Sequence, residues 1–265
     1  MAPLDTPHAV PPRSAASTPA AVFAAARQAD PARPFLTYYD DATGERVELS
    51  LTSLDNWVAK TANLLQDGLG TVAGERVALL LPPHWLGAVW TLAAWSAGLV
   101  VDLDDSDGAE VVVAGPHALD EAGAAGGRDT VALALLPLGG PFTDPLPAGV
   151  LDYGVEVPGQ PDAFAPYDPP GAGTDAVVTG GKRVTGEALV ARAIARADEL
   201  GLAAGARLMT DTNPAGSDGY LDALLAPLVR RASVVLLRRP DVAVLERRAA
   251  AEKVSVQRLV TTRPG

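Results

Sequence analysis

Cysteine is absent from the 265 residues, and histidine occurs only three times. The lack of thiols excludes disulfide bonds, thiolate zinc sites and a cysteine nucleophile. His8, His84 and His117 are too few to build a histidine-rich metal site, so we expect no bound metal.

Positive charge is also scarce, because 21 Lys and Arg residues stand against 32 Asp and Glu residues, for a net charge of −11. Nonspecific binding to nucleic acid needs a basic face that displaces counterions, so no nucleic-acid partner is expected. The charge is unevenly placed, and Arg128 is the only Lys or Arg in the acidic stretch 102–175. Positive charge gathers instead in three arginine pairs, at 230–231, 238–239 and 247–248. The pairs could form a local anion site or neutralise acidic residues of the same chain, and both readings stay open.

The first residues contain no basic segment followed by an apolar core, which argues against a secretory signal and favours a cytoplasmic location. Pro82 to Val101 carries no formal charge and has the length of a membrane span. Gly98 interrupts this run, and Asp102 and Asp104 follow it at once with no basic anchor. We therefore interpret the run as a buried helix and a buried strand, with no membrane partner.

Helical and extended patterns alternate along the chain, which predicts parallel strands with helices on both faces of the sheet. We expect a flexible tail at 1–16, a first α/β lobe at 17–135, a Pro/Gly-rich linker at 136–173 and a second α/β lobe at 174–265. The linker is unusually long for an unstructured loop, so it should pack over a surface or join two subdomains.

Helices are predicted at 17–29, 52–68, 84–97, 116–122, 186–200, 220–229 and 242–253, with Thr52 and Asp55 as a capping box for the second. A hairpin is predicted at 35–50, and strands at 76–81, 99–103, 110–114, 130–135, 176–179, 206–210, 233–237 and 256–260.

The most specific pattern lies between Ser50 and Val101. A Ser-Leu-Thr-Ser-Leu-Asp start opens a helix at Leu51–Asp55, Gly-Glu-Arg-Val-Ala-Leu forms a strand at Gly74–Leu79, and Ala97–Gly98 leads into another strand. This order resembles the opening of adenylate-forming enzymes, which include acyl-CoA synthetases, luciferases and the adenylation domains of peptide synthetases. A weaker similarity continues to about residue 260, and the chain is similar to short actinobacterial proteins that themselves resemble AMP-binding enzymes. The resemblance implies a layered, largely parallel sheet flanked by helices, like a truncated N-terminal domain of such an enzyme.

The family binds ATP phosphates with a Ser/Thr/Gly-rich loop whose backbone amides and lysine neutralise oxyanions. The corresponding segment here reads DAVVTGGKRVTGEALV, so Thr179, Gly180, Gly181 and Lys182 are the candidate remnant of that loop. The resemblance makes ATP or AMP the candidate ligand. The competing interpretation is a plain strand-to-helix turn with an exposed lysine.

Other family features are missing from the sequence: the histidine of the loop at 210–219, the adenine and ribose motifs, and the C-terminal domain with its catalytic lysine. We therefore expect an acyl-CoA synthetase-like pseudoenzyme that does not adenylate by itself and that serves as a nucleotide-binding, acyl-ligand-binding or regulatory module. A protein–protein interaction module is the alternative. A second alternative is a magnesium-dependent phosphatase, because Val-Val-Asp-Leu-Asp-Asp-Ser at 100–106 imitates an aspartyl-phosphate strand, with Asp102 and Asp104 as its acids and Lys182, Asp211 and Asp218 further on.

Overall fold

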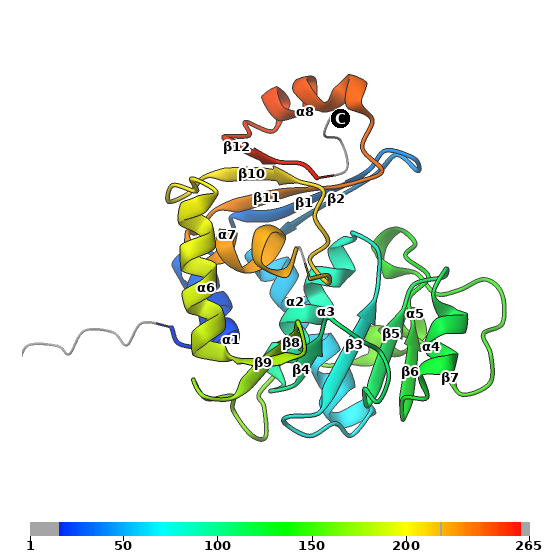
Figure 1. Cartoon of the computed structure of the whole chain (residues 1–265). Helices are drawn as coiled ribbons and strands as arrows, with labels where there is room; N and C mark the ends of the chain where they lie inside the picture. The colour runs from blue at the N-terminus through cyan, green and yellow to red at the C-terminus, as the bar shows by residue number, and fades with distance from the viewer. Residues whose placement is uncertain (1–15, 218, 261–265) are drawn as a thin grey trace, which may run out of the picture.

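A computed structural model describes residues 16–217 and 219–260, and the predicted flexible tail lies almost entirely outside these residues. The chain forms two sheets with helices between and around them (Figure 1). The five-stranded sheet has the order β12 (Val256–Arg258), β10 (Arg207–Thr210), β11 (Ser233–Arg238), β1 (Pro34–Asp40), β2 (Glu45–Ser50). The seven-stranded sheet has the order β7 (Val150–Asp152), β6 (Asp129–Ala132), β5 (Val111–Ala114), β3 (Arg76–Leu80), β4 (Val100–Asp102), β8 (Asp175–Thr179), β9 (Lys182–Thr185). Within the described residues only β1–β2 and β8–β9 pair antiparallel, which confirms the largely parallel α/β fold.

Helices α2 (Leu51–Asn63) and α3 (Trp85–Ser96) lie between the two sheets, and the main hydrophobic core surrounds them (Figure 1). The other face of the large sheet is covered by α4 (Leu119–Ala125), through Ala122. The other face of the small sheet is covered by α8 (Leu245–Ala251), through Leu245. The predicted helices on both faces are thus present.

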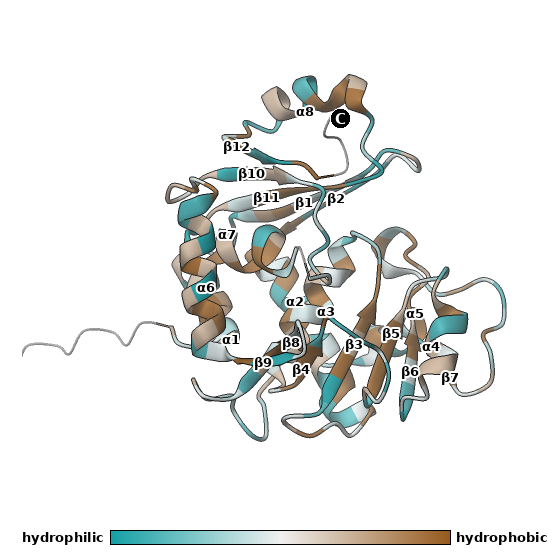
Figure 2. Ribbon diagram, in the orientation of Figure 1, coloured by the Kyte–Doolittle hydropathy of each residue, from teal (hydrophilic) through white to brown (hydrophobic). Residues whose placement is uncertain are grey.

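The apolar run that could have spanned a membrane forms the centre of this core. Every residue of α3 from Trp85 to Trp95 is buried, and Gly98 turns the chain into β4 with a φ of 75°. Figure 2 shows the corresponding hydrophobic colour where α3 and the strands of the large sheet meet. Among the described residues, no helix combines the length and the apolarity needed to cross a bilayer.

Three further helices stand side by side at the left of Figure 1: α1 (Pro19–Ala29), α6 (Gly186–Glu199) and the short α7 (Ala226–Val229). Thr18 caps α1 by accepting a hydrogen bond from the amide of Ala21. Thr185 caps α6 in the same way through the amide of Ala188.

The predicted cap at Thr52 was wrong, and two of the predicted helices are partly π-helical. The cap of α2 is Ser50, whose hydroxyl accepts from the amide of Ser53, because the helix begins at Leu51 and Thr52 lies within its first turn. The hydroxyl of Thr52 donates to the carbonyl of Pro31 instead. The predicted helix at 52–68 changes to a π-helical turn at Leu64–Gly68, and the predicted helix at 220–229 begins as a π-helix at Tyr220–Leu225.

The segment 136–173 contains β7 and the short helix α5 (Tyr153–Glu156), and its later part runs along α2. There Lys60 donates to the carbonyl of Gln160. The side-chain amide of Asn63 donates to the carbonyls of Pro161 and Ala163. Each sheet takes strands from both sides of this segment. Each sheet therefore contains strands from both of the predicted lobes.

Candidate functional site

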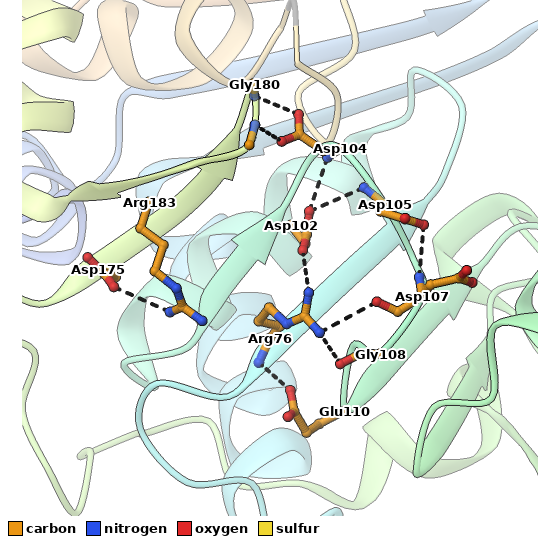
Figure 3. Close-up of polar contacts among 11 residues, drawn as sticks. Arg76, Asp102, Asp104, Asp105, Asp107, Gly108, Glu110, Asp175, Gly180 and Arg183 are labelled. Atoms are coloured by element: carbon orange, nitrogen blue, oxygen red, sulfur yellow. Dashed lines mark hydrogen bonds and ion pairs between the residues drawn. The ribbon is translucent and has the colours of Figure 1, made fainter.

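The acidic loop after β4 is organised around the buried carboxylate of Asp102. One oxygen pairs with the Arg76 guanidinium at 3.0 Å, and the other accepts from the amides of Asp104 and Asp105 at 3.1 and 3.2 Å (Figure 3). Arg76 also donates to the carbonyl of Gly108, on the far side of the loop. Three donors thus bind the Asp102 carboxylate, and two of them are backbone amides of the loop itself.

Asp104 joins this loop to the candidate phosphate-binding turn. Its two carboxylate oxygens accept the backbone amides of Gly180 and Gly181 at 2.8 and 2.7 Å (Figure 3). These are two of the backbone amides that the sequence analysis proposed for phosphate binding. In this structure they are bound instead by the carboxylate of Asp104.

The candidate turn is a β-hairpin rather than a strand-to-helix turn. Thr179 and Lys182 pair as the last residues of β8 and the first of β9, and α6 begins only at Gly186. Gly180 and Gly181 both have left-handed φ values, 59° and 68°, which a two-residue hairpin loop requires and which glycine adopts without strain. Lys182 is exposed, and its side chain has no hydrogen-bond or ion-pair partner within the described part of the chain.

The remaining predicted acids lie elsewhere. Asp211 follows β10, is buried, and accepts the amide of Val260 at 2.7 Å, while Asp218 lies outside the described residues. The loop after Asp211 is fixed to the other sheet, because the side-chain amide of Asn213 donates to the carbonyl of Leu81 at 2.6 Å. Residues 16–217 and 219–260 contain no group of three or more His, Asp or Glu side chains arranged to hold a metal ion.

His84 is a residue whose surroundings the sequence did not indicate. It caps α3, since its Nδ1 accepts the amide of Leu86 at 3.1 Å, and its ring lies 4.8 Å from that of Tyr38. Burial, aided by the nearby positive charge of Arg238, lowers the pKa of His84 to about 3. The imidazole is therefore neutral at physiological pH and serves as a hydrogen-bond acceptor inside the core.

The Asp104 contact was also missed, because 76 and 77 positions of sequence separate the aspartate from its two glycine partners. Only the pairing of β4 with β8 brings them together. The Asp-Leu-Asp-Asp sequence suggested reactive acids, whereas the first two of these aspartates bind protein groups.

The two sheets, their order and the helices between them match part of the fold of acyl-CoA synthetases. An acyl-CoA synthetase from Brucella canis matches 92% of this chain with a TM-score of 0.74 at 18% identity. Acetoacetyl-CoA synthetase from Streptomyces lividans matches 91% of it with a TM-score of 0.73, also at 18% identity. The chain spans about half the length of these solved structures, 47% and 42% respectively. The predicted resemblance to the N-terminal region of adenylate-forming enzymes is confirmed at the level of fold.

A relative in sequence is a TIGR03089 family protein from Mycobacterium tuberculosis, which is 42% identical over 233 residues. The match covers 86% of this chain and 92% of the relative. The chain belongs to the TIGR03089 family. No family model matches the sequence.

Proposed function

We propose that this protein is an acyl-CoA synthetase-like binding or regulatory module that does not form acyl adenylates by itself. The observation that carries the proposal is the contact between the Asp104 carboxylate and the amides of Gly180 and Gly181. A triphosphate needs several donors and a positive field, and this turn offers two amides, both bound to a carboxylate, and one lysine.

Electrostatics support the same conclusion. A phosphate entering the turn would have to displace Asp104 and would then lie beside an acidic loop that also holds Asp105 and Asp107. The negative charges of this loop would repel the phosphate. The turn is therefore a poor triphosphate site as long as Asp104 binds the amides of Gly180 and Gly181.

The direct test is carboxylate-dependent exchange of pyrophosphate into ATP, measured with a panel of carboxylates and with an active acyl-CoA synthetase as positive control. We expect no exchange above background. Robust exchange that is abolished by Lys182→Ala would overturn the proposal.

Ligand binding is tested by thermal shift with ATP, AMP, CoA and an acyl-CoA, with and without magnesium. A ligand specific for the folded state raises the unfolding free energy by about 2.7 kcal/mol at a hundredfold excess over Kd. For a nucleotide at the turn, we expect a shift that is lost in Lys182→Ala and larger in Asp104→Asn. Asp144→Asn is the control, since Asp144 is an exposed carboxylate outside this loop. Equal shifts in the wild type, Asp104→Asn and Lys182→Ala would exclude the turn as the binding site.

The two alternatives make different predictions. An interaction module would show no shift with these ligands and would co-purify reproducibly with one cellular protein. A phosphatase would release phosphate with magnesium and lose this activity in Asp102→Asn. The ion pair of Asp102 with Arg76 weighs against the phosphatase, because an attacking carboxylate has to be free to reach phosphorus.

A further inference from the structure

Two adjoining hollows lie at the N-terminal ends of the parallel strands of the small sheet. Strands β1, β10 and β11 are parallel, so the residues just before them lie at the same end of the sheet. These residues are Arg33 before β1, Gly205 before β10 and Arg231 before β11. The first hollow has a volume of about 210 Å³ and the second about 280 Å³. Ala26, Leu228 and Arg231 line both, so the two hollows adjoin at these residues. Thr210 and the loop that follows it lie at the opposite, C-terminal ends of these strands.

The walls of the second hollow are apolar and come from three helices. Val22 of α1, Val190 and Ile194 of α6, and Leu228 of α7 line it. Ile194 is the only isoleucine of the chain, and 44% of its surface is exposed. Because Val22, Val190 and Leu228 are nearly buried, a hydrocarbon group placed here would mainly cover Ile194 and remove its apolar surface from water.

Two guanidinium groups stand at the first hollow. Arg33 is held in place because it donates to the carbonyls of Gly205, at 3.0 Å, and of Arg231. These two bonds leave further N–H groups of Arg33 free to donate. The side chain of Arg231 is exposed, and no partner for it occurs among the described residues.

Other charges nearby only partly offset these two. Arg230 lines the second hollow and is paired with Asp198, while Asp30 is the carboxylate that lines the first hollow. Arg33 and Arg231 against Asp30 leave one excess positive charge in the first hollow. In a chain with a net charge of −11 this is a local reversal of sign.

We propose that the two hollows form a binding site for an anionic amphiphile. Its hydrocarbon chain lies along Val22, Ile194 and Leu228, and its carboxylate or phosphate head group binds Arg231 and Arg33. Guanidinium groups bind both kinds of head group through paired, charge-assisted hydrogen bonds. The site lies away from the hairpin turn that stands in the place of the phosphate loop, so it is independent of whether the protein adenylates carboxylates.

The test is isothermal titration of the full chain with decanoate, decyl phosphate, decanol and butyrate, each below its micelle concentration. We expect decanoate or decyl phosphate to bind at least tenfold more tightly than decanol, which lacks the charge, and than butyrate, which lacks the chain. The relative affinities of decanoate and decyl phosphate distinguish a fatty carboxylate from a phosphate-bearing lipid.

Variants assign the binding to these residues. Arg231→Gln removes the free charge and keeps the backbone carbonyl that Arg33 uses, so binding of the anionic probe should weaken about tenfold. Ala25→Phe, which adds a ring to the wall of the second hollow, should weaken binding of the ten-carbon probes while its circular dichroism stays that of the wild type. Arg247→Gln, a change at an exposed arginine of α8, should leave the affinity unaltered.

The proposal is overturned if neither anionic probe binds, if decanol binds as tightly as the anions, or if Arg231→Gln and Arg247→Gln have equal effects.

Discussion

At the scale of single residues, His84 shows how a buried polar group ties stability to pH. Its pKa is lowered to about 3 in the folded protein and is near 6.5 in an unfolded chain. Between these values the unfolded state binds the additional proton, so the free energy of unfolding decreases as the pH falls below 6.5. The loss from this group approaches about 1.4 kcal/mol per pH unit until the pH nears 3.

His84→Asn should remove this dependence while keeping a side chain that can cap α3. We expect urea unfolding of the variant to lose less free energy between pH 7 and pH 5 than unfolding of the wild type. His117→Asn, at a site where the ring is not buried, is the control and should leave the slope unchanged. Identical slopes for the wild type and His84→Asn would show that the histidine takes up its proton equally in the folded and unfolded states, which contradicts a lowered pKa.

At the scale of elements, one buried carboxylate connects a helix, a π-helical segment and an edge strand. Asp222 lies in the π-helical segment and accepts two hydrogen bonds from Arg196 of α6, at 2.6 and 2.9 Å, and one from Arg258 of β12, at 3.3 Å. Only 4% of its side chain is exposed, whereas Arg196 and Arg258 are 27% and 29% exposed. Its charge therefore compensates two guanidinium groups at once.

Asp222→Asn should destabilise the protein by about 2 kcal/mol, less than a fully buried pair would cost, because both arginines keep some contact with water. The measurement is the midpoint of urea unfolding at pH 7. Glu199→Gln removes the other, exposed acidic partner of Arg196 and should cost less than about 0.5 kcal/mol. A larger effect of Glu199→Gln than of Asp222→Asn would contradict this assignment.

At the scale of the whole molecule, the two sheets share one hydrophobic core. It runs from Val22 and Phe23 of α1, through Trp90 of α3, to Val234 and Leu236 of β11. Strands from before and after residues 136–173 pair with each other in both sheets. Neither predicted lobe can thus unfold without exposing the apolar surface of the other.

We accordingly expect a single cooperative unfolding transition for the whole chain. Tryptophan fluorescence reports on α2 and α3, and amide exchange reports separately on β10 and β11. Coincident transitions by both probes, with equal free energies, are the expected result. Two separated transitions would instead favour lobes at 17–135 and 174–265 that unfold independently.

The sequence by itself determined the fold class of this protein and most of its helices and strands. The helix at 17–29, the hairpin at 35–50 and the buried run at 84–103 are local signals, because periodicity and turn residues act within a few positions. The resemblance carried by Leu51–Asp55 and Gly74–Leu79 gave the architecture.

Only the tertiary structure decided what the candidate site is. Whether Gly180 and Gly181 offer their amides to a ligand depends on Asp104, which reaches them through the pairing of β4 with β8. The partners of Asp222 and the hollow beside Arg33 and Arg231 also join segments far apart in the chain. Such contacts are set by sheet order and by packing between helices, and short-range sequence patterns carry no record of either.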